Sequence, residues 1–137
     1  MSAGVRKHGE DGTPVRVLVC DDTKELRTLL RWALEHEAGV EIVGEATDSE
    51  EAARLAGETA PDVVLLDLDM PGGGPAALLF GVRAAAPRTA IITFSGHEPE
   101  LVAPEAARLV ALHVPKTTDL PEVRRAVLEI GRARRRS

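Results

Sequence analysis

Five short hydrophobic runs alternate with helix-like segments along most of this 137-residue chain. Runs such as Val15–Cys20 and Val63–Leu66 are continuous and apolar, as expected for strands that are buried on both faces. The alternation predicts an α/β domain, a doubly wound parallel sheet in which right-handed crossovers place helices on both faces. The expected strands are residues 15–20, 40–46, 63–66, 89–94 and 112–115.

Capping residues and prolines indicate where the helices begin and end. Asp48 is followed three positions later by Glu51, which is a capping-box pattern at a helix start, and Asp119 is followed in the same way by Glu122. A helix cannot easily run through Pro104, so we expect the fourth helix to be short. The expected helices are residues 23–37, 48–57, 75–86, 104–110 and 119 to about 130.

Composition and charge exclude several classes of protein. The net charge of −5 argues against general nucleic-acid binding, and aromatic residues at 2% leave few side chains for stacking on bases. No apolar run is long enough to cross a membrane, and a single cysteine gives no disulfide framework. We therefore expect a cytoplasmic domain over residues 15–131, with a flexible tail over 1–14 and a basic tail with four arginines over 132–137.

Reactive side chains lie directly after the predicted strands. Because ligands of such sheets bind outside the carboxyl ends of the strands, we expect these groups to meet at one edge. Three carboxylates close together repel one another unless a cation is present, and oxygen ligands favour a hard ion such as Mg²⁺. The residues concerned are Asp21, Asp22, Asp67, Ser95 and Lys116.

The same residue types suit phosphoryl transfer. A carboxylate can attack phosphorus and form an acyl phosphate. Mg²⁺, the ammonium of Lys116 and the hydroxyl of Ser95 are groups that could each hold one oxygen of the phosphoryl group. Asp67 is the best candidate for the nucleophile, because it ends the central apolar strand and precedes a glycine-rich loop, M-P-G-G-G-P, whose backbone can approach a ligand closely.

Four motifs in this order, V-L-V-C-D-D, V-V-L-L-D-L-D-M-P-G, I-I-T-F-S-G and H-V-P-K, resemble the receiver domain of two-component response regulators over about residues 15–131. The resemblance implies a flavodoxin-like sheet in strand order 2-1-3-4-5 and a place in phosphorelay signalling. It also implies a phosphoacceptor protein rather than an enzyme, apart from help with its own phosphorylation and dephosphorylation. Its phosphodonor would be a histidine kinase or a histidine phosphotransfer protein, and it would signal through a downstream protein partner or an output domain outside this chain.

Residue roles follow from that resemblance. Asp67 would accept the phosphoryl group, with Ser95 and Lys116 contacting it. Asp22 would bind Mg²⁺ directly and Asp21 would support the site. The implied metal site consists of Asp21, Asp22, Asp67 and the backbone carbonyl of Asp69.

The region that transmits the signal departs from the family pattern. The switch position, three residues before Lys116, is usually Tyr or Phe, and here it is His113. Histidine is smaller than tyrosine and can carry a charge near neutral pH. Together with a short fourth helix, His113 predicts a weak or pH-dependent coupling between phosphorylation and the rest of the domain. The other interpretation of His113, a partly buried core residue, is the more common role of such a histidine.

Two other functions remain open from the sequence. Asp67-Leu68-Asp69, with Ser95 and Lys116 later in the chain, also resembles haloacid-dehalogenase-type phosphatases, although the acidic pair Asp21-Asp22 comes too early for that family. The chain could also be a binding module that keeps the fold and works without phosphorylation. In the first case a phosphate ester would be turned over, and in the second Asp67 would not be labelled.

Trp32 is expected to lie off the apolar stripe of the first helix. It is either a partly covered surface residue or the anchor of an interface with the phosphodonor protein. Cys20 is expected to be a small buried apolar residue rather than a redox centre. The expected stripe consists of Leu26, Leu29, Leu30 and Ala33.

Overall fold

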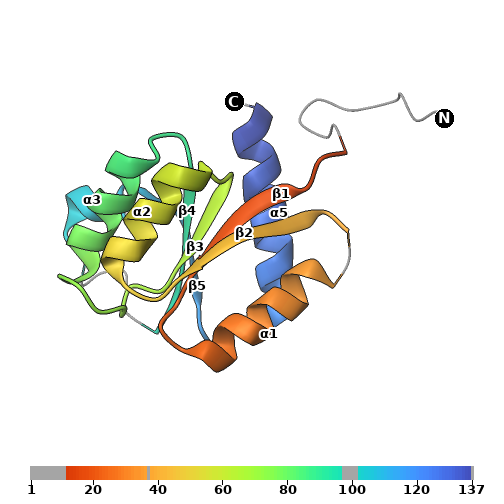
Figure 1. Ribbon diagram of the computed structural model, residues 1–137, viewed down its shortest axis with the longest axis horizontal. Coiled ribbons are helices and arrows are strands. Elements are labelled where there is room, and N and C mark those ends of the chain that lie inside the picture. The colour runs from red at the N-terminus through yellow and green to blue at the C-terminus, as the bar shows by residue number, and fades with distance from the viewer. Residues whose placement is uncertain (1–11, 37, 97–101, 137) are drawn as a thin grey trace.

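Five parallel strands form one sheet in the order β2-β1-β3-β4-β5 in the computed structural model, which describes residues 12–36, 38–96 and 102–136. The order and the parallel pairing confirm the predicted fold class (Figure 1). Most of the expected flexible tail, residues 1–11, lies outside the described residues. The strands are β1 Val15–Cys20, β2 Val40–Ala46, β3 Val63–Leu66, β4 Ala90–Ser95 and β5 Val110–Pro115.

The helices cover both faces of this sheet (Figure 1). One hydrophobic cluster joins the sheet to α2, α3 and α4, and the other joins it to α1 and α5. No helix among residues 12–36, 38–96 and 102–136 is long and apolar enough to cross a membrane. The helices are α1 Lys24–Glu35, α2 Ser49–Thr59, α3 Pro75–Ala85, α4 Pro104–Ala107 and α5 Leu120–Arg136.

Both predicted capping residues hold a helix start. Asp48 Oδ1 accepts a hydrogen bond from the backbone N–H of Glu51 at 2.8 Å, and Asp119 Oδ1 accepts one from that of Glu122 at 3.0 Å. The carboxylate of Glu51 turns back and accepts from the N–H of Thr47, one residue before the expected partner. Local sequence therefore determines where α2 and α5 begin.

The boundary between α4 and β5 differs from the prediction. The fourth helix is short, as expected, but it ends at Ala107 rather than at residue 110, and β5 begins at Val110 rather than at residue 112. Val110 pairs with Ile91 of β4, so ladder hydrogen bonds replace a second helical turn. Strand β4 is also shifted by one residue, to 90–95, which places Ser95 inside its last position.

The predicted basic tail is helical over most of its length. Helix α5 continues to Arg136, because Arg135 attaches its last turn to the start of the sheet. The guanidinium of Arg135 donates to Asp62 Oδ2 at 2.8 Å and to the carbonyl oxygens of Thr13 and Pro14. Asp62 is buried and also accepts from the backbone N–H of Arg16.

Gly131 allows α5 to lie directly against β1. A Cβ at this position would come within 2.4 Å of Val15 Cγ1, a branched side chain within the core. Gly131→Ala is therefore expected to destabilise the protein by about 1–2 kcal/mol, since overpacking outweighs the gain of about 1 kcal/mol in helix propensity. Gly57→Ala in α2 is the matched control, because its Cβ would meet only ordinary contacts at 3.6 Å and beyond, and it should be neutral or stabilising. Urea unfolding of both variants measures the difference, and equal effects would contradict the close approach.

Candidate functional site

The reactive side chains that the sequence predicts lie at the carboxyl ends of β1, β3, β4 and β5. These strand ends lie toward the lower left in Figure 1. Asp21 and Asp67 each directly follow a strand, and their side chains are buried, at 1% and 2% exposure. Asp22 is exposed beside them. Parallel strands place these ends at one edge, so residues far apart in the chain become neighbours.

Lys116 lies between the two buried carboxylates. Its Nζ is 3.2 Å from Asp67 Oδ2 in a hydrogen bond, and 3.0 Å from Asp21 Oδ2 in an ion pair without hydrogen-bond geometry. Burial of the ammonium lowers the pKa of Lys116, but its close contacts with the carboxylates of Asp21 and Asp67 outweigh that effect, so the net pKa is raised. Lys116 therefore stays charged at neutral pH and offsets part of the repulsion between the carboxylates.

The donor set fits a hard divalent cation. One oxygen each from Asp21, Asp22 and Asp67 can be chosen so that all three lie within 4.8 Å of one another. Three carboxylates face one ammonium in this site, which leaves an excess of negative charge. Oxygen ligands with an excess of negative charge are what Mg²⁺ requires.

The backbone around Asp67 holds its carboxylate in place. The N–H of Asp69 donates to Asp67 Oδ1 at 3.0 Å, and the N–H of Asp67 donates to the carbonyl of Cys20 in β1. The glycine-rich loop then packs against the start of α2: Gly72 has φ of 115°, and a Cβ there would lie 2.9 Å from Ser49 Cβ. Glycine is needed at this position both for its backbone conformation and for the close approach.

The side chain of Asp69 makes a contact that the sequence did not indicate. Ser95 Oγ donates to Asp69 Oδ2 at 3.2 Å. The sequence predicted a role only for the backbone carbonyl of Asp69, but its side chain binds the hydroxyl at the end of β4. Whether its backbone carbonyl binds a metal stays a prediction. The spacing D-L-D after a strand was the available signal, because it returns the second aspartate to the same edge.

His113 lies next to Thr93 on the neighbouring strand. His113 Nδ1 and Thr93 Oγ1 are 2.7 Å apart, a hydrogen-bond distance, and the imidazole is half-buried. Both side chains line an apolar cavity of about 320 Å³ between β5 and α4, together with Leu68 and Leu79. The family pattern has a large aromatic ring at this position. Here the position holds the imidazole of His113, which is hydrogen-bonded to the hydroxyl of Thr93.

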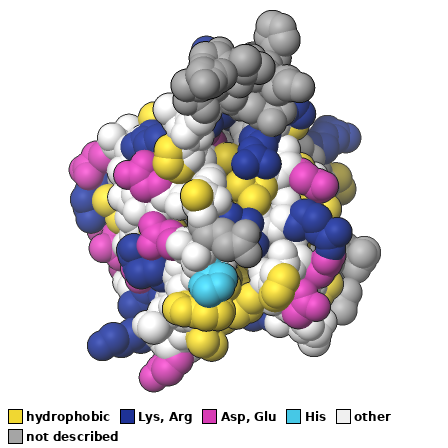
Figure 2. Space-filling view, turned by 90° about the vertical axis from the view of Figure 1, so that its right-hand side faces the viewer, with side chains coloured by type: hydrophobic (Ala, Val, Ile, Leu, Met, Phe, Trp, Pro, Cys, Tyr) yellow, Lys and Arg dark blue, Asp and Glu magenta, His cyan; other side chains and the backbone are white. Residues whose placement is uncertain are grey.

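Cys20 and Trp32 lie where the sequence predicts, the first buried and the second off the buried stripe of α1. Cys20 is buried, and burial, with added repulsion from Glu51 and Asp21, raises the pKa of its thiol, which disfavours the reactive thiolate. Trp32 is 64% exposed, and its ring centroid lies 4.7 Å from that of His36. Figure 2 shows the mixture of charged and hydrophobic side chains on one face of the molecule.

One prediction for α1 is wrong. Leu29 was expected on the buried stripe but is more than half exposed, and Leu34 is buried instead. The helix presents residues 30, 33 and 34 to the sheet, which turns residue 29 toward solvent on the side of Trp32.

Comparison with known proteins identifies the family. Residues 17–128 match the response regulator receiver domain. The chain belongs to this family. As a receiver domain it is a component of two-component signalling, which confirms the resemblance inferred from the four motifs.

Several curated proteins are similar in sequence to this receiver. It is 42% identical over 91 residues, 65% of its length, to protein-glutamate methylesterase/protein-glutamine glutaminase 5 of Myxococcus xanthus, of which the match covers 26%. It is 33% identical over 91 residues to the nitrate/nitrite response regulator NarL of Escherichia coli, covering 65% of this chain and 42% of that protein. The matches thus span less than half the length of these relatives.

Solved receivers have the same architecture. The receiver domain of the response regulator NarL from Mycobacterium tuberculosis superposes with a TM-score of 0.77 at 33% identity, covering 87% of this chain and 97% of that one. The response regulator domain of CheB from Thermotoga maritima gives 0.74 at 28% identity, covering 90% and 98%. The family match and these likenesses support a receiver domain over the haloacid-dehalogenase-type alternative.

Proposed function

We propose that this receiver accepts a phosphoryl group on Asp67, with Mg²⁺ bound beside it, and passes the signal on through protein contacts in the cytoplasm. The observation that carries the proposal is the position of Lys116, which lies 3.2 Å from Asp67 and 3.0 Å from Asp21 at the carboxylate edge. A buried carboxylate that shares an ammonium with a second carboxylate and has a third one nearby is suited to receive a phosphoryl group.

The transfer follows from these groups. Oδ of Asp67 attacks the phosphorus of a phosphohistidine, the P–N bond of the donor breaks, and an acyl phosphate forms on Asp67 while the histidine nitrogen takes the electron pair. Lys116 then donates its hydrogen bond to a phosphoryl oxygen instead of to Asp67. Ser95 donates to a second phosphoryl oxygen instead of to Asp69. Mg²⁺ held by Asp21, Asp22 and Asp67 would neutralise the remaining charge.

Labelling tests this function directly. Acetyl phosphate with Mg²⁺ should add one phosphoryl group to the intact protein, detected by mass spectrometry under conditions that preserve acyl phosphates. The same reaction with EDTA should give none. A protein that stays unlabelled under both conditions would favour the phosphorylation-independent binding module instead.

Asp22→Ala should weaken Mg²⁺ binding by at least about tenfold, because losing even an outer partner of a metal ligand typically costs 10–100-fold in affinity. Asp22 is exposed and makes no ion pair with Lys116, so its replacement removes charge without disturbing that contact. Asp21→Ala should weaken binding less. Titration with Mg²⁺ followed by Trp32 fluorescence or NMR measures this, with Glu58→Gln as a control for a distant lost carboxylate. Equal affinities of wild type and Asp22→Ala would contradict the assignment.

The hydrogen bond between His113 and Thr93 is expected to limit the switch. Ser95 can move toward a phosphoryl group without releasing the ring of His113, because that ring is bound to Thr93, two residues before Ser95 in β4. We therefore expect small amide shifts over residues 102–115 on activation with beryllofluoride. Large shifts throughout these residues would show an ordinary switch.

The partners follow from the same proposal. The phosphodonor is a histidine kinase or a histidine phosphotransfer protein, and the exposed face of α1 around Leu29 and Trp32 is the candidate docking surface. The receiver acts through a downstream protein or through an output domain joined to it. The methylesterase and NarL relatives are longer than the matched region.

A further inference from the structure

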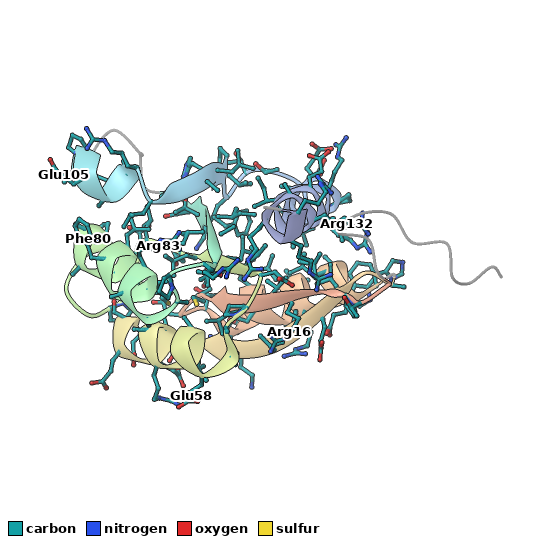
Figure 3. All side chains as sticks on the ribbon, turned by 90° about the horizontal axis from the view of Figure 1, so that it is seen from above. Arg16, Glu58, Phe80, Arg83, Glu105 and Arg132 are labelled. Atoms are coloured by element: carbon teal, nitrogen blue, oxygen red, sulfur yellow. The ribbon has the colours of Figure 1, made fainter. Side chains whose placement is uncertain are left out.

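A cationic cavity lies at the opposite edge of the sheet from Asp67. It has a volume of about 520 Å³ and lies between the end of α3, the start of β4 and the last turns of α5. Figure 3 shows these helices, with Arg83 labelled on α3. The apolar part of its wall comes from Pro87, Ala90, Ala111, Ile130 and Ala133.

Three arginines from three separate segments line this cavity: Arg83, Arg88 and Arg134. Arg83 Nη1 donates to the carbonyls of Ala86 and Pro87, which leaves its Nε and Nη2 donors for another partner. Arg134 uses its Nε to bind the carbonyl of Arg88 at 3.0 Å. Within the described part of the chain, no hydrogen bond or ion pair is found for the guanidinium of Arg88.

Little negative charge balances these guanidinium groups. Asp62 Oδ1 is 3.5 Å from Arg134 Nη1, but the same carboxylate binds Arg135 more closely, at 2.8 Å. Burial lowers the pKa of Arg83, and no carboxylate opposes that effect. The cavity is therefore positive in a protein whose net charge is −5.

An unpaired hydroxyl lies in the wall of the same cavity. Thr89 is 3% exposed, and its Oγ1 has no hydrogen-bond partner among the described residues. Buried hydroxyl groups normally have a partner, because leaving one unpaired costs free energy. Because Oγ1 itself is shielded from solvent, a bound anion would supply the missing acceptor only after rotation of the Thr89 side chain.

We propose that this cavity, lined by Arg83, Arg88, Thr89 and Arg134, binds a small molecule with a diphosphate group. The planar forks of guanidinium groups match phosphate oxygens, and three of them suit more than one charge. The volume exceeds what a single phosphate needs, and the apolar wall can cover an organic part of the ligand. This site is separate from Asp67 and does not depend on its phosphorylation.

The test is a titration of the full chain with inorganic diphosphate and with ADP, each in EDTA, followed by amide NMR. Saturable shifts are expected over residues 83–90, 111 and 130–134. Arg88→Gln and Arg134→Gln should each weaken binding by at least about fivefold, since each removes charge-assisted hydrogen bonds. Arg125→Gln is the matched control: it lies on α5, removes the same charge, pairs with Glu122 outside the cavity, and should change affinity less than about twofold.

Any of the following results would overturn the proposal: no saturable shifts at millimolar diphosphate, equal weakening by all three variants, or shifts confined to the Asp21–Lys116 edge. ADP binding more tightly than diphosphate would assign a nucleotide, and equal affinities would assign free diphosphate. Adenosine without phosphate binding as well as ADP would also contradict the site. Circular dichroism of each variant checks that the fold is intact.

Discussion

Asp67→Asn is expected to take up no phosphoryl group from acetyl phosphate and Mg²⁺, while the wild-type protein takes up one. The substitution keeps the shape of the side chain. Its single amide oxygen can replace only one of the two Asp67 oxygens that accept from the Asp69 N–H and from Lys116, and it does not act as the nucleophile. Intact mass measured under acyl-phosphate-preserving conditions gives the result.

The neighbouring aspartate provides the control. Asp69→Asn removes the carboxylate that binds Ser95 but leaves Asp67 and Lys116 unchanged, so it should still be labelled. Acid-labile phosphate that persists on the Asp67→Asn protein would show that another residue is the acceptor. Loss of labelling in both variants to the same extent would assign the effect to the loop rather than to Asp67.

Lys116→Met is expected to destabilise the metal-free protein by about 2 kcal/mol. The carboxylates of Asp21 and Asp67 are almost fully buried, and removal of their ammonium leaves buried charge without compensation. The expected effect is smaller than the 3–5 kcal/mol typical of buried pairs, because the Lys116 side chain is 31% exposed and solvent screens it.

Urea unfolding in EDTA and in Mg²⁺ distinguishes this explanation from lost packing. Mg²⁺ should restore much of the stability of Lys116→Met, since it supplies positive charge to the same carboxylates. Lys24→Met, an exposed lysine at the start of α1, should change stability by less than about 0.5 kcal/mol. A loss that Mg²⁺ does not reduce would contradict the electrostatic origin.

The raised pKa of Lys116 gives this stabilisation a defined pH range. A group whose pKa is higher in the folded than in the unfolded state stabilises the fold fully below its unfolded pKa, near ~10.4 for lysine. The stabilisation is lost as the pH rises through the higher folded pKa. The difference between wild type and Lys116→Met should therefore be constant through neutral pH and decrease only in strongly alkaline solution.

Much of the fold could be predicted because its signals are local. Apolar runs identified all five strands, and the pairs Asp48/Glu51 and Asp119/Glu122 marked two helix starts that the structure confirms. The α4–β5 boundary could not be predicted, because Val110 suits either a helix or a strand. Pairing of Val110 with Ile91, on a different strand, decides between them.

The sequence was enough to predict which residues form the candidate site and that they lie at one edge of the sheet. Strand ends in a parallel sheet converge whatever the loops do, so Asp21, Asp67 and Lys116 had to be neighbours if the strands were correct. Their roles in phosphorylation stay predictions. The hydrogen bonds of Ser95 to Asp69 and of His113 to Thr93 depend on side-chain directions that no spacing in the sequence specifies.

The sequence by itself determined the alternating elements, their parallel arrangement and the acidic edge, because periodicity, capping and the connectivity of parallel strands act over short stretches of chain. Only the tertiary structure decided which side chains that are far apart in the sequence come into contact. Arg135 reaches Asp62 and continues α5 through the predicted tail, Leu29 turns to solvent, and Arg83, Arg88 and Arg134 surround one cavity. These contacts depend on how helices are rotated and how long they run against the sheet, which is set by packing of the whole core.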